Sequence, residues 1–464
     1  MLFWSKNIAR TPILLLAAAE ASILYVSVYF ACGIVFGDIE SGQQALGSIA
    51  PRAGALSAVM LVSMIAMGLY QFHQRVFFHE VMIRVIVGVA IGSLVLAAIY
   101  PFLPGVNLEP KVAALAVLSA LVFLLVLRFY FLRNIDFNIF RRRTLIYGAG
   151  ARAAAITDLK RRADRRGFQV VGTIAAPGDT VSEQRIDLMD TDRTLVDVAR
   201  EHNADEIVVA MDDRRGNLPI RELLDCKLRG INVIDLLEFL ERETGKIHID
   251  LVNPGWLIFS PGFRVSRSRR IVKRILDFIV GFAVLIVTSP LMLMVAVAIK
   301  IEDGLSAPVI FRQRRVGHHG DVFNVLKFRS MRVDAEADGK AVWADKHDKR
   351  VTRVGAIIRR VRLDELPQIV NVFLGQMSLV GPRPERPEFV DHLAEVIPYY
   401  SERHTVKPGV TGWAQLRHAY GSSIEDAEEK LRYDLYYVKN HSLLLDLTII
   451  LQTVEVILWG KGAR

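Results

Sequence analysis

An acidic pair in a basic neighbourhood is the part of this sequence best suited to chemistry. Asp364 and Glu365 stand side by side, Arg359 precedes them, and Arg383 follows within Gly381-Pro382-Arg383-Pro384. Arginines can hold phosphate oxygens, while a carboxylate can attack phosphorus or bind a divalent metal. A bare Asp-Glu pair is more often a solvated helix face, so the surrounding sequence must decide between these interpretations.

The neighbouring segments predict how such a phosphate site is positioned. We expect two strands over 308–314 and 322–328, followed by a helix around 352–362 that leads to the pair. Lys327 and Arg329 close the second strand and are further candidate phosphate ligands. Pro367 predicts an abrupt change of chain direction after the pair. Pro382 and Pro384 stiffen the segment that holds Arg383, whose guanidinium can grip phosphate bidentately.

The composition indicates a membrane protein with large polar parts. Of the 464 residues 52% are hydrophobic, and the mean hydropathy is +0.30. Apolar runs cover 12–36, 53–71, 85–103 and 112–127, each near the roughly 20 residues that cross a bilayer as a helix. A net charge of +9 suits anionic headgroups or phosphorylated substrates. Nucleic acid is disfavoured because no aromatic stacking platform accompanies the basic residues, and two cysteines predict neither a disulfide framework nor a zinc site.

Cations are unevenly distributed around these four runs. They precede the first run, lie between the second and third, and follow the fourth: Lys6, Arg10, Arg75, Arg84, Arg128, Arg133 and Arg141 to Arg143. The positive-inside rule therefore predicts that both ends of the bundle lie in the cytoplasm. The runs carry almost no charge, which disfavours a pump or channel pathway through them.

The segment 141–262 reads as a doubly wound α/β domain. Gly148-Ala149-Gly150 follows an apolar strand and opens a helix, and further strands are expected at 168–174, 206–211 and 231–235. The glycines match a dinucleotide fingerprint. However, the second strand ends Thr173-Ile174-Ala175-Ala176-Pro177, without the acidic residue that would hold a ribose hydroxyl, and no Tyr-x-x-x-Lys pair occurs between 144 and 260. A structural or regulatory domain is favoured over nucleotide binding, and both interpretations stay open. We expect Asp212 to Arg215 to form a solvated loop.

A fifth apolar run, 275–299, has cationic flanks on both sides and Ser289-Pro290 in its middle. These features favour a re-entrant helical hairpin, about 272–300, over an ordinary kinked span. Such a break is tolerated only where protein covers the freed backbone groups, so the element should pack on the following domain. The last apolar stretch, Leu443 to Trp459, contains Asp446 and predicts an amphipathic helix at the membrane surface or against the catalytic core.

Six ordered motifs make the run 270–464 resemble the bacterial sugar transferase family, the monotopic polyprenol-phosphate phosphoglycosyl transferases. They are Lys273-Arg274-Ile275-Leu276-Asp277, Ser289-Pro290, Phe311-Arg312-Gln313-Arg314-Arg315-Val316-Gly317, Lys327-Phe328-Arg329-Ser330-Met331, Arg362-Leu363-Asp364-Glu365-Leu366-Pro367-Gln368 and Gly381-Pro382-Arg383-Pro384. The upstream bundle and Rossmann-like domain resemble the large form of this family. The C-terminal end resembles its exopolysaccharide-associated branch.

The resemblance implies transfer of sugar 1-phosphate from a UDP-sugar to undecaprenyl phosphate, at the cytosolic face of the bacterial inner membrane. As a hypothesis, Asp364 attacks the β-phosphate, and Glu365 shares a Mg²⁺ ion with it. Arg383 and Arg359 would bind phosphate oxygens, with Lys327 and Arg329 as weaker candidates. Lys273 and Arg274 would meet lipid headgroups near the Ser289-Pro290 hairpin.

The predicted domains are a four-helix membrane bundle over 1–140, the Rossmann-like domain over 141–262 and the transferase domain over 263–464. One rival function is a membrane-tethered, NAD-dependent nucleotide-sugar dehydratase or epimerase that uses the glycine fingerprint. Another is a non-enzymatic membrane scaffold, which leaves the Asp-Glu and Pro-Arg-Pro motifs unexplained. A membrane bundle joined to an α/β domain also offers surface for a homodimer. The sequence does not identify the sugar.

Overall fold

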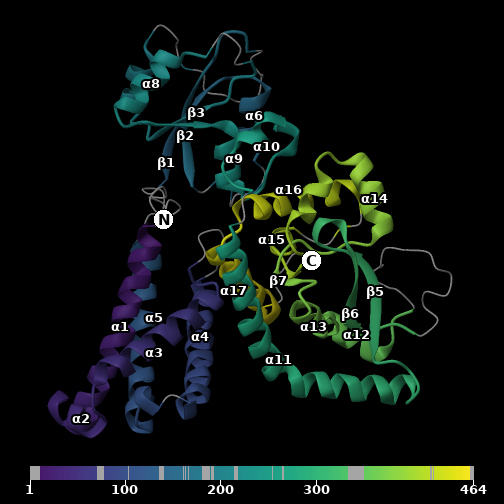
Figure 1. The fold of residues 1–464 in the computed structure, drawn as a ribbon. Coiled ribbons are helices and arrows are strands. Elements are labelled where there is room, and N and C mark those ends of the chain that lie inside the picture. Colours follow the sequence, from purple (N-terminus) through teal and green to yellow (C-terminus); the bar gives the residue numbers. More distant parts are fainter. Residues whose placement is uncertain are drawn as a thin grey trace. The chain divides into compact units, whose positions relative to one another are not determined.

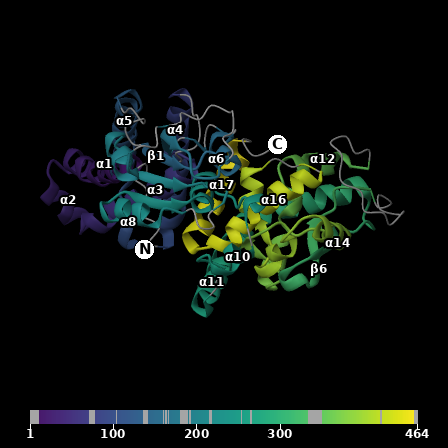
Figure 2. The same cartoon turned by 90° about the horizontal axis from the view of Figure 1, so that it is seen from above.

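The computed structural model folds into two compact units, Met1–Thr244 and Gly245–Arg464. Figures 1 and 2 show their elements in two perpendicular views. The structure describes residues 11–459 with the exception of 71–77, 103, 135–140, 160, 162–163, 166, 180–188, 190–192, 214–217, 253, 264–265, 333–349, 419–420 and 422. The predicted topogenic cations Lys6, Arg10 and Arg75 therefore lie outside the described residues.

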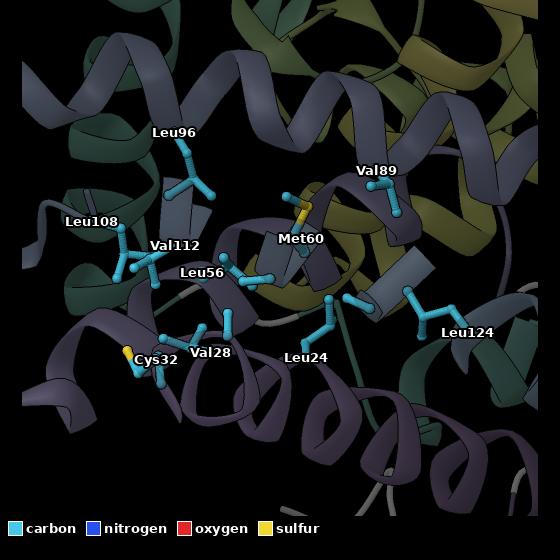
Figure 3. Close-up of a cluster of buried hydrophobic side chains, with 14 of the residues drawn as sticks. Leu24, Val28, Cys32, Leu56, Met60, Val89, Leu96, Leu108, Val112 and Leu124 are labelled. Carbon is cyan, nitrogen blue, oxygen red and sulfur yellow. The ribbon is translucent and has the colours of Figure 1, made fainter. Parts of the chain in front are cut away.

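The first unit begins with helices rich in apolar residues: α1 (Thr11–Phe36), α2 (Ile39–Leu46), α3 (Ile49–Ala66), α4 (Phe78–Ile99) and α5 (Pro110–Asn134). All except α2 are long and apolar enough to cross a membrane, and α11 of the second unit is a fifth such helix. Buried side chains from α1, α3, α4 and α5 form one core, which includes Leu24, Leu56, Met60, Val89 and Leu124 (Figure 3). The four predicted apolar runs thus correspond to four long helices that pack together.

A buried ion pair links two helices of the bundle. Glu20 of α1 is fully buried and forms an ion pair with Arg128 of α5, with Nε 2.5 Å from Oε1. Tyr70 also donates to Glu20, and Arg128 donates to Leu69 O at 2.9 Å. Ionisable groups in apolar helices are costly unless they pair. This pair therefore fixes α1 against α5 and against the segment that follows α3.

The α/β part of the first unit has a four-stranded parallel sheet in the order β2-β1-β3-β4. The strands are β1 (Arg142–Tyr147), β2 (Phe168–Ile174), β3 (Glu206–Val209) and β4 (Asn232–Asp235), with helices α6 (Ala151–Thr157), α7 (Leu195–Glu201), α8 (Ile220–Leu228) and α9 (Leu236–Thr244). The predicted strands and the doubly wound pattern are confirmed, with strand ends shifted by at most two residues.

The glycine-rich turn after β1 is closed by two carboxylates of the same domain. Gly148 has a φ of 122°, and a Cβ there would lie 2.5 Å from the carbonyl carbon of Ala210, so only glycine fits. Asp179 accepts from Ala149 N at 2.8 Å, while Asp212 accepts from Ala151 N at 3.1 Å and Arg152 N at 2.8 Å. In a dinucleotide site such N–H groups face a pyrophosphate. Here a phosphate would have to displace a carboxylate of like charge.

The second unit has two small sheets surrounded by helices. Strands β5 (Ile310–Val316) and β6 (Val322–Phe328) form an antiparallel hairpin, and β7 (Ser378–Val380) pairs in parallel with β8 (Gly409–Thr411). The other elements are η5 (Ile249–Leu251), α10 (Pro254–Phe259), α11 (Arg267–Asp303), η6 (His318–Gly320), α12 (Arg353–Arg360), η7 (Leu363–Glu365), α13 (Gln368–Phe373), α14 (Pro387–Val396), η8 (Tyr400–Thr405), α15 (Trp413–Arg417), α16 (Ile424–Asn440) and α17 (Leu443–Trp459).

This unit starts earlier than the predicted transferase domain, which was placed from residue 263. Ile247 and Ile249 are buried in a cluster with Leu431 and Leu435 of α16. Ile247 N also donates to Arg432 O at 3.0 Å. Residues 245–262 therefore pack with the second unit, a long-range association that a composition shift along the chain does not reveal.

The fifth apolar run forms one continuous helix, α11, in place of two helices joined by a turn. Figure 1 shows that this helix bends sharply partway along its length, and Pro290 lies inside it. One proline removes a single backbone donor, which bends a helix without ending it. Large apolar side chains along the helix are exposed, among them Val287, Leu293 and Ile301.

Both ends of α11 contact the same unit. Near its start, Asp277 accepts from Ser378 Oγ at 3.0 Å and from Leu379 N at 3.1 Å. At its end, Glu302 accepts from Arg353 N at 2.7 Å and from Val354 N at 2.8 Å. The predicted packing of this element on the domain that follows is confirmed. Helix α17 also packs inward, with Ile449 fully buried in the core.

Candidate active site

The acidic pair lies in a short 3-10 turn between two helices. Helix α12 ends at Arg360, and Arg362 then adopts the left-handed region with a φ of 57° before η7 begins at Leu363. The chain changes direction at Arg362. Pro367 was predicted to redirect the chain after the pair. There, Leu366 and Pro367 keep right-handed helical dihedral angles and lead into α13, so the left-handed residue lies before the pair, at Arg362. Proline suits a helix start because its missing N–H is not needed there.

Glu365 is held by three cations. Arg383 Nη2 donates to its Oε1 at 2.7 Å, Lys327 Nζ lies 3.6 Å from the same oxygen, and Arg362 Nη1 lies 3.7 Å from Oε2. Only 12% of its side chain is exposed. Burial opposes ionisation, but these cations outweigh it and hold the pKa of Glu365 well below its usual range. Glu365 is therefore a fixed anion at neutral pH.

Asp364 differs from its neighbour. It is half-buried, and among the described residues no hydrogen bond or ion pair engages its carboxylate. Burial and the adjacent Glu365 charge raise its pKa above the usual range, against the opposing effect of Lys327, Arg383 and Arg359. A carboxylate with few hydrogen bonds and a raised pKa is a better nucleophile than a carboxylate held in several ion pairs.

Lys327, near the end of β6, places its ammonium group beside the acidic pair. Burial, and then the nearby Arg383 and Arg315, lower its pKa to about 8, while Glu365 favours its charged form. The strand position is set by Asn371 of α13, whose Oδ1 accepts from Leu326 N at 3.0 Å and whose Nδ2 donates to Asn324 O at 2.8 Å. The structure thus brings together Lys327, Asp364, Glu365 and Arg383, as the sequence predicts.

Of the other two predicted phosphate ligands, Arg359 and Arg329, one lies near the acidic pair and one does not. Arg359 is half-buried on α12 and acts electrostatically on Asp364. Arg329 donates to Pro308 O at 3.0 Å, and no contact joins it to the acidic pair in the described part of the chain. Pro382 and Pro384 flank Arg383 in a segment without regular secondary structure.

The predicted lipid-facing residues have internal partners. Lys273 Nζ lies 2.7 Å from Asp446 and also donates to Val380 O and Tyr437 Oη. Arg274 donates to Val372 O at 2.5 Å and to Phe373 O at 2.7 Å. Both side chains therefore anchor α11 to the domain, a role that the sequence did not indicate. Ser289 Oγ donates to Ile286 O within the helix, next to Pro290.

A divalent metal fits this site only with help from a ligand. Among the described residues, no group of three or more histidine, cysteine or acidic side chains could hold a metal ion. Asp364 and Glu365 offer two hard carboxylate groups, and Arg362 Nη1 lies 3.7 Å from Glu365 Oε2, too far for a hydrogen bond. Mg²⁺ is commonly bound by one or two carboxylates together with substrate phosphates. The pair suits that mode of binding.

Sequence reasoning missed a buried pair behind Arg383. Arg403 Nη2 donates to Asp434 Oδ2 at 2.7 Å and to Arg383 O at 3.0 Å. The two side chains lie on different elements, η8 and α16, 31 positions apart in the chain. A lone arginine and a lone aspartate at this separation leave no spacing pattern, so the sequence held no signal for them.

Comparison with known proteins matches residues 268–460 to the family described as bacterial sugar transferase. The chain is 43% identical over 247 residues to the UDP-N-acetylgalactosamine-undecaprenyl-phosphate N-acetylgalactosaminephosphotransferase of Aeromonas hydrophila, covering 53% of this chain and 56% of the relative. It is 35% identical over 331 residues to the UDP-glucose:undecaprenyl-phosphate glucose-1-phosphate transferase of Klebsiella pneumoniae, covering 70% and 69%. It is 40% identical over 201 residues to the exopolysaccharide production protein PSS of Rhizobium leguminosarum, covering 41% and 98%. The chain thus spans between about half and nearly all of the length of these relatives, and it belongs to the bacterial sugar transferase family.

Proposed function

We propose that this protein transfers sugar 1-phosphate from a UDP-sugar to undecaprenyl phosphate and releases UMP, as the initiating step of exopolysaccharide or other glycan assembly. The names of the Aeromonas and Klebsiella relatives support the reaction type. The observation that carries the proposal is the asymmetry of the acidic pair: Glu365 lies within 4 Å of three cations, whereas none of the described residues forms an ion pair with Asp364. The names of these relatives point to different sugars, so the sugar stays open.

In the first step, a carboxylate oxygen of Asp364 attacks the β-phosphorus of the UDP-sugar. A new bond forms between that oxygen and phosphorus, and the bond from the β-phosphorus to the bridging oxygen breaks. UMP leaves with the bridging oxygen and its electron pair. Arg383, Arg359 and Lys327 bind phosphate oxygens, which offsets the repulsion between an anionic nucleophile and an anionic substrate.

In the second step, a phosphate oxygen of undecaprenyl phosphate attacks the same phosphorus. The aspartyl–phosphorus bond breaks, Asp364 is restored as a carboxylate, and the lipid gains a diphosphate linked to the sugar. Neither step requires a general base, because both attacking oxygens are already anionic near neutral pH. Glu365 and Asp364 would hold Mg²⁺, whose charge screens the diphosphate.

The contacts at the ends of α11 support a specific membrane geometry. The start of this helix bonds to Ser378 and Leu379, and its end bonds to Arg353 and Val354 of the same unit. A helix whose two ends are fixed to one compact unit cannot have that unit on both sides of a bilayer. These contacts support a re-entrant placement of α11, and the cation distribution around the bundle supports the cytosolic side of the inner membrane, where a nucleotide sugar would meet a lipid phosphate.

The test is release of UMP from a panel of UDP-sugars by the full-length protein in lipid nanodiscs. With labelled UDP-sugar and no lipid phosphate, we expect about one sugar phosphate bound per polypeptide, sensitive to hydroxylamine as an acyl phosphate is. Adding undecaprenyl phosphate should transfer this label to lipid. Lipid product without any protein-bound label, or full activity in Asp364→Asn, would contradict the covalent route.

A further inference from the structure

The segment that carries Arg383 is held in place by its backbone carbonyls. Three successive carbonyls accept hydrogen bonds from three separate segments: Pro382 O from Gly409 N at 2.9 Å, Arg383 O from Arg403 Nη2 at 3.0 Å, and Pro384 O from Arg315 Nη1 at 3.1 Å. The prolines restrict φ within this segment. They do not decide where the segment lies. The three donors do so together with two flanking backbone bonds, from Gly381 N to Thr411 O and from Val316 N to Glu385 O, each at 2.9 Å.

Arg403 is the unusual donor of the three. Only 5% of the residue is exposed, and its guanidinium also bonds Tyr400 Oη and Asp434 Oδ2, each at 2.7 Å. Asp434 is 2% exposed. Replacing a buried ion pair by well-packed apolar side chains is often neutral or stabilising, so such a pair is weak evidence for a role in stability. Beyond its own network, this pair contacts the backbone of Arg383.

The backbone that presents Arg403 is itself strained. Tyr399 adopts a left-handed conformation, with a φ of 63°, directly before η8 (Tyr400–Thr405). For a bulky residue this conformation costs free energy and persists only where the surroundings impose it. The turn places Tyr400 and Arg403 in one short helix, with the phenol and the guanidinium in contact.

We propose that Arg403, fixed by Asp434 and Tyr400, is a positioning residue that places Arg383 for its contact with Glu365 and with the substrate phosphates. The connection runs from Asp434 to Arg403, to the Arg383 carbonyl, and through the Arg383 side chain to Glu365 Oε1 at 2.7 Å. The substrate part of this inference rests on the proposed function, whereas the contact with Glu365 does not.

The first test compares Arg403→Lys with Arg432→Lys. Arg432 is a matched control because it is also largely buried and bonds Asp250 and Glu428, away from the Arg383 segment. Lysine keeps the charge but loses the planar fork that holds several acceptors at once. We expect UMP release to fall about 10-fold to 100-fold in Arg403→Lys, since small misplacements of a binding group have effects of this size. Arg432→Lys should stay within about twofold.

A double-mutant cycle separates positioning from general damage. If Arg403 acts through Arg383, then adding Arg403→Lys to Arg383→Ala should lower the residual activity by less than about twofold. The same loss in both backgrounds would overturn the proposal, and so would equal activity of Arg403→Lys and the Arg432→Lys control.

Hydrogen exchange gives a readout that does not depend on activity. In nanodiscs, Arg403→Lys should raise amide exchange in peptides covering 381–390, with no change there in Arg432→Lys. If exchange rises but the natural protein releases no UMP, the positioning role stands and the proposed reaction falls. Unchanged exchange in these peptides would overturn the positioning role, whatever the activity.

Discussion

Two regions have residues suited to binding phosphate: the glycine-rich turn after β1 and the acidic pair after α12. Their surroundings differ in whether they leave those groups available to a ligand. At the turn, the carboxylates of Asp179 and Asp212 accept from the N–H groups that a phosphate would need. At the pair, cations gather on Glu365 and leave Asp364 without a bonded partner among the described residues. A sequence motif provides chemical groups, but the surrounding residues determine whether these groups can bind a ligand or react.

The largest expected effect comes from removing the free carboxylate. Asp364→Asn keeps the shape of the side chain but removes the charge of the proposed nucleophile, so we expect UMP release to fall by about 10³-fold or more. The matched control is Asp225→Asn, an exposed aspartate in α8 that pairs with Arg229. Comparable activity in these two variants would remove the contrast between the regions.

The second effect tests the held carboxylate. Glu365→Gln removes the charge that Arg383 and Lys327 surround, so these cations lose their anionic partner and the proposed Mg²⁺ would lose a ligand. We expect UMP release to fall about 10²-fold, less than for Asp364→Asn, with the protein-bound sugar phosphate still detectable. Reversal of this order, with Glu365→Gln the more severe, would make Glu365 the nucleophile.

A smaller effect concerns pH and the buried pair behind Arg383. Burial raises the pKa of Asp434 to about 6, although Arg403 and Lys430 favour its charged form and Glu385 opposes it. Below about pH 6 the carboxyl gains a proton and attracts Arg403 less, so the Arg383 segment should loosen and activity should fall. Asp434→Asn is uncharged at every pH and should be about tenfold less active at pH 8.

The ratio of natural to variant activity is the measurement that isolates this group. It should approach one as the pH falls through about 6, because both side chains are then neutral. A ratio that stays constant from pH 5 to pH 8 would show that Asp434 does not titrate in this range.

The smallest effect on catalysis is expected at the glycine turn. Asp212→Ala removes the acceptor for Ala151 N and Arg152 N, and loss of such a cap typically costs about 0.5–2 kcal/mol of stability. Thermal unfolding should shift to lower temperature while UMP release stays within about twofold. Calorimetry with UDP and with NAD provides the second readout. Stronger binding by the variant would show that the turn is an anion site closed by its own carboxylate.

Much of the fold could be predicted because it depends on local pattern. The four apolar runs, the strands of the parallel sheet, the β5–β6 hairpin and the helix before the pair follow from hydrophobic periodicity and turn residues. The turn at Arg362 could not be predicted, because the left-handed conformation of an arginine reflects tertiary packing that has no local signature. The inward-facing roles of Lys273 and Arg274 were missed for the same reason.

The residue types and their order establish which groups are available: two adjacent carboxylates, the cations Lys327, Arg359 and Arg383, and a long apolar run with a proline inside it. The differences between these groups arise from the folded arrangement. It ties Glu365 to Arg383 and Lys327, leaves Asp364 unpaired within the described residues, and places Arg403 behind Arg383. The physical reason is that pKa values and hydrogen bonds depend on burial and on distances between residues far apart in the chain, which residue types and spacing do not encode.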